Sequence, residues 1–220
     1  MKSVVQLLAV VLVVSGVFGF LIYNKNIMPD SGMVIVLNGP SSVGKTSIVK
    51  ALQKKEASPL LSIGIDNFFV GVIPQRFYLE DRIEHHKVMR GVASVEGDKK
   101  VFTLSIGSEG QKIIKGMHRA IAEYAKQSCN VIVDYITYEP ELRDDLLQVL
   151  DGLTVIKVGV KASLAVIEQR ETERATSPEG HARSHYDTVH EGWNYDISVD
   201  SENKSPEEIA AKISDYFRSL

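Results

Sequence analysis

The feature that most constrains this chain is the run Gly39-Pro40-Ser41-Ser42-Val43-Gly44-Lys45-Thr46, which fits the pattern G-x-x-x-x-G-K-[ST]. The apolar run Met33–Leu37 before it indicates a buried parallel strand, and Ser47–Leu52 after it indicates a helix. A strand, a glycine-rich loop and a helix in this order form a phosphate site, because successive backbone N–H groups and the positive end of the helix face the phosphate. The sequence therefore predicts a nucleotide site formed by Gly39, Pro40, Ser41, Ser42, Val43, Gly44, Lys45, Thr46 and Ser47.

Two side chains of this loop carry the chemistry expected at such a site. Lys45 is expected to reach the β- and γ-phosphates, and the Thr46 hydroxyl is expected to ligate Mg²⁺. The apolar run Val131–Val133 ends in Asp134, and an acidic residue in that position commonly orients the magnesium ion or its waters. The sequence thus predicts ATP and Mg²⁺ as cofactors, with Thr46 and Asp134 as metal ligands.

Apolar strand patterns alternate with helical patterns from Met33 onward, which is typical of a parallel sheet covered on both faces. The sequence predicts an α/β P-loop NTPase fold with five parallel strands and helices on both faces. Residues 67–107 show no clear pattern and are expected to form an insertion on the substrate side. The predicted strands cover residues 33–38, 60–65, 130–135, 153–160 and 197–199, and the helices cover 108–127, 139–149, 163–174 and 206–218.

Asp66 follows the second predicted strand. Ligands of open parallel sheets bind beyond the carboxyl ends of the strands, so Asp66 could face a substrate hydroxyl. A carboxylate there can take the hydroxyl proton as the oxygen attacks the γ-phosphorus. The alternative is that Asp66 caps the next helix, since aspartate is a common N-cap residue. The residues alone leave both roles open.

Arg170 and Arg174 lie four residues apart on a predicted helix. Like charges at this spacing repel each other, which favours an anion between them. A flexible segment after the helix would suit a lid that delivers guanidinium groups to a transferring phosphate. The alternative is a solvated helix face on which glutamates at positions 168, 171 and 173 neutralise the arginines.

Several of these motifs, in this order, resemble the chloramphenicol phosphotransferase-like family of P-loop kinases. The resemblance covers the chain from about Met33 to its C-terminus. It rests on Asn38–Ser47, Gly64–Phe68, Gly116–Ala120 and Val131–Asp134, and most distinctively on Arg170–Arg174 with Val189–Gly192 and Tyr195-Asp196.

This resemblance implies a nucleoside-kinase-like fold and phosphate transfer from ATP to a hydroxyl of a small molecule, as in chloramphenicol 3-O-phosphorylation. Asp66 matches the catalytic base of the family, Gly39–Thr46 its ATP site, and Arg170 and Arg174 its lid arginines. The family usually has a further basic residue after the second arginine, where this chain has Ala175-Thr176-Ser177-Pro178. The N-terminal apolar segment also departs from the compact form of the family.

That segment, Val4–Tyr23, has no charged side chain. About 20 helical residues span about 30 Å, the thickness of the hydrocarbon layer of a bilayer. The favoured interpretation is a single-pass membrane anchor with the kinase domain in the cytoplasm. A cleaved signal peptide would explain Lys2, and translation from Met28 or Met33 would give a soluble cytoplasmic protein. The expected division is an apolar segment with a linker over residues 1–32 and a kinase domain over 33–220.

Composition and missing motifs argue against other classes of function. A net charge of −3 gives no electrostatic basis for nucleic-acid binding, and the lone Cys129 excludes an internal disulfide. A GTP-dependent switch would need an Asn-Lys-x-Asp motif, which Asn203–Pro206 does not provide. A membrane-tethered nucleotide sensor is the other alternative, but a sensor needs no base at Asp66. No feature of the sequence indicates the oligomeric state.

Overall fold

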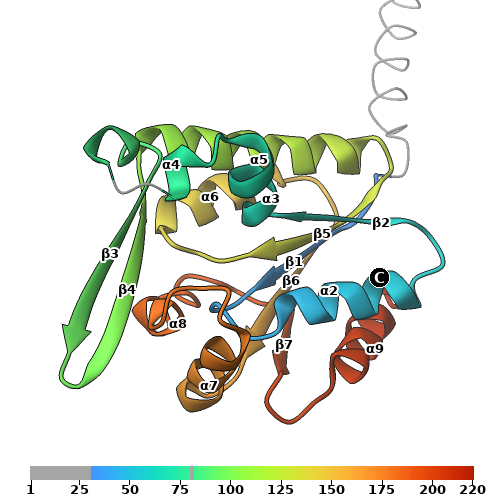
Figure 1. Ribbon diagram of the computed structural model, residues 1–220. Coiled ribbons are helices and arrows are strands. Elements are labelled where there is room, and N and C mark those ends of the chain that lie inside the picture. Colours follow the sequence, from blue (N-terminus) through green and yellow to red (C-terminus); the bar gives the residue numbers. More distant parts are fainter. Residues whose placement is uncertain (1–30, 80–81) are drawn as a thin grey trace, which may run out of the picture.

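The computed structural model describes residues 31–79 and 82–220 (Figure 1). The hydrophobic helix expected over Val4–Tyr23 lies outside these residues. Within the described ranges, no helix has both the length and the apolar character needed to cross a membrane.

The centre of the fold is a parallel sheet of five strands in the order β2-β5-β1-β6-β7. The strands are β1 (Val34–Asn38), β2 (Leu60–Gly64), β5 (Asn130–Tyr135), β6 (Val155–Lys161) and β7 (Ile197–Asp200). The prediction of five parallel strands is confirmed, and each predicted end lies within two residues of the observed one. The middle strand β1 is buried along its whole length, as its continuous apolar run requires.

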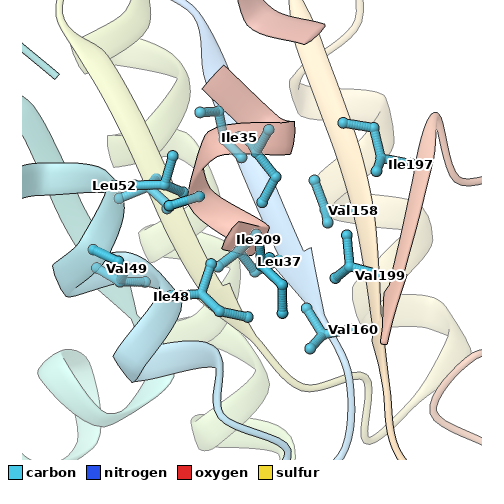
Figure 2. Close-up of a cluster of buried hydrophobic side chains, with 14 of the residues drawn as sticks. Ile35, Leu37, Ile48, Val49, Leu52, Val158, Val160, Ile197, Val199 and Ile209 are labelled. Atoms are coloured by element: carbon cyan, nitrogen blue, oxygen red, sulfur yellow. The ribbon is translucent and has the colours of Figure 1, made fainter. Parts of the chain in front are cut away.

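Helices cover both faces of this sheet (Figure 1). On one face, Ile35 and Leu37 of β1 pack with α2 (Lys45–Lys55), α7 (Leu164–Arg174), α8 (His181–Ser184) and α9 (Pro206–Phe217). Figure 2 shows part of this cluster, in which side chains of α2 and α9 meet those of β1, β6 and β7. On the other face, Val34 and Val36 pack with α3 (Ile65–Val72), α5 (Ser108–Lys126) and α6 (Pro140–Val149).

A hairpin extends from the sheet layer beside α8 (Figure 1). It pairs β3 (Met89–Glu96) with β4 (Lys99–Ile106) in antiparallel register, and Glu96 lies opposite Lys99 across the loop Gly97-Asp98. The short helices α4 (Arg76–Leu79) and η1 (Ile83–His85) precede it. The expectation of an irregular segment over 67–107 was therefore wrong, because most of the described residues of this segment form helices and strands.

The carboxyl ends of three neighbouring strands bring the predicted site residues to one edge of the sheet. Asp134 near the end of β5 lies in register with Leu37 of β1 and with Gly64 of β2. The phosphate loop follows β1 directly, and Asp66 follows β2 by two residues. This edge is where ligands of open α/β sheets bind.

Candidate active site

The phosphate loop adopts a conformation that its glycines permit. Gly44 has φ +99°, in the left-handed region, and it is the residue from which α2 begins. Gly39 lies so close to β6 that an added Cβ would come within 2.5 Å of the Val160 carbonyl oxygen. Ser42 has φ +59°, and its buried hydroxyl is without a hydrogen-bond partner among the described residues. A ligand that offers a polar atom to this loop would satisfy that hydroxyl.

Lys45 lies inside the loop, with only 5% of its surface exposed. Its Nζ donates hydrogen bonds to the carbonyl oxygens of Gly39 at 2.8 Å and Pro40 at 2.9 Å, and lies 3.8 Å from Asp134 Oδ1. Burial lowers the pKa of the ammonium group, and the negative charges of Asp134 and Asp66 oppose that shift. Lys45 thus holds a buried amino group inside the loop that the sequence predicts to be the phosphate site.

The two predicted metal ligands lie together. Thr46 Oγ1 donates a hydrogen bond to Asp134 Oδ2 at 2.8 Å, so a hydroxyl and a carboxylate oxygen share one point beside Lys45. Oxygen donors of this kind suit Mg²⁺, which usually takes only one or two protein ligands and completes its shell with water and phosphate oxygens. The donor set therefore fits the ion that the sequence predicts.

A cavity of about 690 Å³ lies beside the loop. One wall is the loop and the first turns of α2, another is the last turn of α7, and the third is the segment between β7 and α9. Sequence reasoning missed this third wall, although turn-forming residues after a strand could have indicated it. The lining residues that the argument uses are Ser42, Arg170, Arg174 and Ser201.

Arg170 and Arg174 both line this cavity, as expected for residues one helical turn apart. Arg170 donates to the Ser201 carbonyl oxygen at 2.7 Å, and Ser201 Oγ donates to the Val43 carbonyl oxygen of the loop at 2.6 Å. Arg174 Nε donates to Thr176 Oγ1 at 2.6 Å. Thr176 belongs to the stretch Ala175–Pro178, which departs from the family pattern, and its hydroxyl holds Arg174.

The glutamates on α7 do not neutralise these arginines. Glu168 pairs with Arg183, and buried Glu171 accepts the backbone N–H groups of Gly180 and Ala182, both at 2.8 Å. In the part of the chain that the structure describes, neither Arg170 nor Arg174 forms an ion pair with a glutamate of this helix. The neutralisation by these glutamates that the alternative interpretation expects is therefore absent among the described residues, although Arg174 itself is exposed.

A second cavity of about 740 Å³ lies on the other side of Arg174, which lines both cavities. Its walls come from α3, the β3–β4 hairpin, the segment after β5 and the loop between α7 and α8. The residues from the 67–107 segment that line it include Phe69, Phe77, Met89, Gly91 and Phe102, and the expected place of this segment on the substrate side stays a prediction.

Asp66 lies in this second cavity, in the first turn of α3. The N-cap residue of α3 is Gly64, whose N–H donates to Asn67 Oδ1 at 2.8 Å, so Asp66 does not cap the helix. Its carboxylate is exposed to the cavity and lies close enough to Lys45 to affect the pKa of the ammonium. The structure thus brings Asp66, Lys45, Asp134 and Arg174 to one junction.

Two histidines near this junction were not found from the sequence. His185 Nε2 accepts the Ser41 N–H of the phosphate loop at 3.1 Å, and its ring lies 4.9 Å from the His181 ring. Burial lowers the pKa of His185 to about 3, and it also lowers the pKa of His181. Their spacing of four residues, in the segment that follows the arginine helix, was the available signal.

Asn38, fully buried at the end of β1, fixes the loop from the other side. Its side-chain N–H group donates to the Val189 carbonyl oxygen and to the Tyr195 hydroxyl, both at 2.7 Å, and its oxygen accepts the Thr137 hydroxyl at 3.0 Å. The most distinctive C-terminal motif therefore contacts the base of the phosphate loop.

The phosphate loop follows the central strand of a five-stranded parallel sheet, and two cavities meet at Arg174. This combination is that of a P-loop kinase. The chain belongs to the chloramphenicol phosphotransferase-like family, whose model matches residues 32–218. It is 30% identical over 192 residues to Rv2636 of Mycobacterium tuberculosis strain H37Rv, a candidate O-phosphotransferase, and the alignment covers 87% of this chain and 84% of the relative. The match to MT2714 of strain CDC 1551 has the same values. The chain is accordingly a small-molecule kinase.

Solved structures share the fold at low sequence identity. The APS kinase CysC of M. tuberculosis matches with a TM-score of 0.59 and 17% identity, covering 86% of this chain and 99% of that one. The tunicamycin resistance protein of Deinococcus radiodurans matches with a TM-score of 0.58 and 17% identity, covering 84% and 95%. A sugar kinase from Janibacter sp. HTCC2649 matches with a TM-score of 0.57 and 18% identity, covering 86% of this chain and 95% of that one. At these identities the likeness concerns the fold alone.

Proposed function

We propose that this chain transfers the γ-phosphate of ATP to a hydroxyl group of a small molecule. The observation that carries the proposal is the meeting of two cavities at Arg174, with the phosphate loop in one and Asp66 in the other. The name of the family makes chloramphenicol the first acceptor to test.

On the nucleotide side, the chain offers what a magnesium triphosphate needs. Ser42 and the loop N–H groups would hold phosphate oxygens, Lys45 would match the charge of the β- and γ-phosphates, and Thr46 with Asp134 would hold Mg²⁺. The ion, when bound, would neutralise charge that develops on the phosphate oxygens. Arg170 and Arg174 would contribute further positive charge from the facing wall.

On the acceptor side, Asp66 is the group proposed to take the proton. It lies in the second cavity, which adjoins the first at Arg174. Its carboxylate does not cap α3, because the Gly64 N–H donates to Asn67 instead. The acceptor oxygen would bond to the γ-phosphorus as the bond from that phosphorus to the bridging oxygen of ADP breaks. The hydroxyl proton would pass to the Asp66 carboxylate, so the step balances without a further reagent.

The experiment that tests the proposal follows labelled γ-phosphate from ATP into products. Purified protein is incubated with Mg²⁺ and chloramphenicol, nucleosides, sugars or aryl alcohols, and the labelled products are separated. We expect label on at least one alcohol, and none with Lys45→Ala, because that variant leaves phosphate charge unmatched in a largely dry site. Lys50→Ala, an exposed lysine on the same helix, is the matched control. Label that appears only in inorganic phosphate would contradict the proposal.

A further inference from the structure

The loop that joins α7 to α8 carries a hydroxyl group whose reactivity the proposed function does not use. Thr176 lines the second cavity together with Asp66, and Arg174, two residues earlier, lines both cavities. The Thr176 side chain is exposed, so its hydroxyl is open to a reagent in the cavity. In this stretch the family usually has a basic residue, and this chain has alcohol side chains instead.

The backbone of the loop is fixed at both ends by one residue, Glu171. At the start, the Ala175 N–H donates to the Glu171 carbonyl oxygen at 3.1 Å, and at the end the Gly180 N–H donates to the Glu171 carboxylate at 2.8 Å. Ala175 has φ +48°, in the left-handed region, so the chain turns as α7 ends. After this turn the Thr176 hydroxyl lies against Arg174, where it is held before any ligand binds.

The hydrogen bond between these two side chains leaves the hydroxyl proton free. Arg174 Nε can only donate, so the Thr176 oxygen accepts, at 2.6 Å. Among the described residues, no group accepts the proton of this hydroxyl. A hydroxyl that attacks phosphorus must give up its proton, and one whose proton is uncommitted can give it to a nearby carboxylate.

The charges around Lys45 place this hydroxyl near the point of phosphate transfer. Burial lowers the pKa of the Lys45 ammonium, and the charges of Asp66 and Arg174 both lie close enough to act on it as well. Thr176 Oγ1 belongs to the same junction, because it lies against Arg174 Nε. The junction therefore already holds a hydroxyl, a cation for the phosphate and a carboxylate that can take a proton.

We propose that Thr176 is a site of self-phosphorylation, at which the chain transfers the γ-phosphate of ATP to its own hydroxyl when no small molecule fills the second cavity. The bond from Thr176 Oγ1 to the γ-phosphorus forms as the bond from that phosphorus to the bridging oxygen of ADP breaks. The hydroxyl proton passes to the Asp66 carboxylate. The inference rests on the nucleotide site and the base of the proposed function, and it adds a hydroxyl of the protein as a second acceptor.

The product would limit the activity of the chain. A phosphothreonine carries a charge of about −1.5 to −2 and would form charge-assisted hydrogen bonds with Arg174. Arg174 also lines the nucleotide cavity, so its positive charge would then be matched before a triphosphate arrives. Self-phosphorylation would accordingly weaken the binding of the next nucleotide.

A positioning role for Thr176 is the alternative to be separated. In that role the hydroxyl only holds Arg174 in place, and its removal changes nucleotide affinity and turnover without any covalent change. A phosphate bound covalently to the chain is the readout that only self-phosphorylation gives.

The experiment incubates the full purified chain with γ-labelled ATP and Mg²⁺ in a buffer free of alcohols. The protein is then denatured and digested, and the labelled peptide is mapped by mass spectrometry. We expect a single phosphate per chain, on Thr176, with a rate constant that is independent of protein concentration, because the hydroxyl and the nucleotide site belong to one molecule. The phosphorylated protein should bind Mg·ATP about 10-fold more weakly than untreated protein, since like charges then face each other at the junction.

Four variants locate the reaction. Thr176→Val keeps the shape of the side chain and should take no label at this position, whereas Thr176→Ser keeps a hydroxyl and should be labelled. Asp66→Asn should slow labelling about 10²–10⁴-fold, because the proton has no base to receive it. Thr172→Val is the matched control on α7 and should be labelled like the wild type. The Thr172 hydroxyl donates to the Glu168 carbonyl oxygen at 3.0 Å and does not belong to the described walls of either cavity.

The possible failures are distinct. Labelled alcohols with unlabelled protein would overturn this inference and leave the proposed function standing. Phosphate mapped to another residue, or a rate constant that rises with protein concentration, would overturn intramolecular transfer to Thr176. An unchanged Mg·ATP affinity after labelling would overturn the self-limitation. Label on Thr176 but on no alcohol would support this inference and contradict transfer to small molecules, and label on neither would overturn both.

Discussion

His185 shows how single residues set the shape of the phosphate loop. Its Nε2 accepts the Ser41 N–H at 3.1 Å, so His185, at the end of α8, holds the backbone of the loop. The hydrogen bond requires an unprotonated Nε2, and burial ensures it by lowering the pKa of His185 to about 3.

This dependence predicts acid sensitivity of the fold. Below pH of about 6.5 the unfolded chain binds a proton at position 185 that the folded chain does not bind, so the free energy of unfolding falls as pH falls toward about 3. At pH 5 the loss from this one residue amounts to about 2 kcal/mol. His190, whose pKa burial lowers to about 4, acts in the same direction.

The measurement is denaturant unfolding of the wild type and of His185→Gln between pH 7 and pH 5. Glutamine can still accept the Ser41 N–H but does not titrate, so the variant should lose about 2 kcal/mol less over this range. Equal pH slopes in the two proteins would show that His185 is protonated in the folded state.

At the scale of elements, α7 and α8 act as one unit. Glu171 of α7 is 4% exposed and accepts the N–H groups of Gly180 and Ala182, at the start of α8. The Gly180 carbonyl oxygen in turn accepts the Phe102 N–H of β4 at 3.1 Å. The helix with the two arginines is thereby linked to the hairpin that lines the acceptor cavity.

We predict that Glu171→Gln weakens this link. The amide has one acceptor oxygen instead of two and places a donor group against a backbone N–H, which should cost about 1–3 kcal/mol of stability. The KM for the acceptor should rise several-fold, more than the dissociation constant of Mg·ATP, because the hairpin side loses its support. Glu123→Gln, an exposed carboxylate on α5, is the control. An unchanged acceptor KM would mean that the hairpin is positioned independently of α7.

The elements that the sequence predicted are those with local signals. The strands Val34–Asn38 and Asn130–Tyr135 are continuous apolar runs, and the loop between β1 and α2 is a contiguous motif, so neighbouring residues alone specify them. The edge position of Asp66 follows from strand order in parallel sheets. The β3–β4 hairpin was missed because residues 67–107 show no clear pattern as a whole, although the turn Gly97-Asp98 between two runs of strand-forming residues is a hairpin signal.

The acceptor cavity could not be predicted, because its walls come from segments far apart in the chain. Asp66, Phe102, Tyr138 and His181 converge only through the sheet order and the packing of α8 on β4. His181 Nδ1 likewise lies 3.4 Å from the carbonyl oxygen of Phe102, 79 residues earlier in the chain. Sequence spacing carries no information on such contacts.

For the whole molecule, the described domain contains every group of the proposed site. It begins before β1, where the Gly32 N–H donates to the Ala125 carbonyl oxygen of α5 at 2.8 Å. We propose that the apolar segment Val4–Tyr23 serves as an anchor that is separate from the chemistry. A chain shortened to Ser31–Leu220 should then fold, remain soluble and bind Mg·ATP as the full chain does.

Thermal unfolding and nucleotide titration of the full and shortened chains check this expectation. The shortened chain keeps Gly32, so that its contact with α5 remains. Aggregation, or loss of the cooperative unfolding transition in the shortened chain, would show that the apolar segment packs on the domain as part of its core.

The central claim is that Asp66 takes the proton of the acceptor hydroxyl at the junction of the two cavities. A single-turnover measurement of label transfer from Mg·ATP to an accepted alcohol, with wild type and Asp66→Asn, tests it most directly. The amide keeps the shape of the carboxylate but cannot take up the proton, so the rate should fall about 10²–10⁴-fold. The Mg·ATP dissociation constant should change less than about twofold, because the triphosphate contacts belong to Gly39–Thr46. A rate within about threefold of the wild type would contradict the claim and move the role to another carboxylate, with Asp134 the next to test.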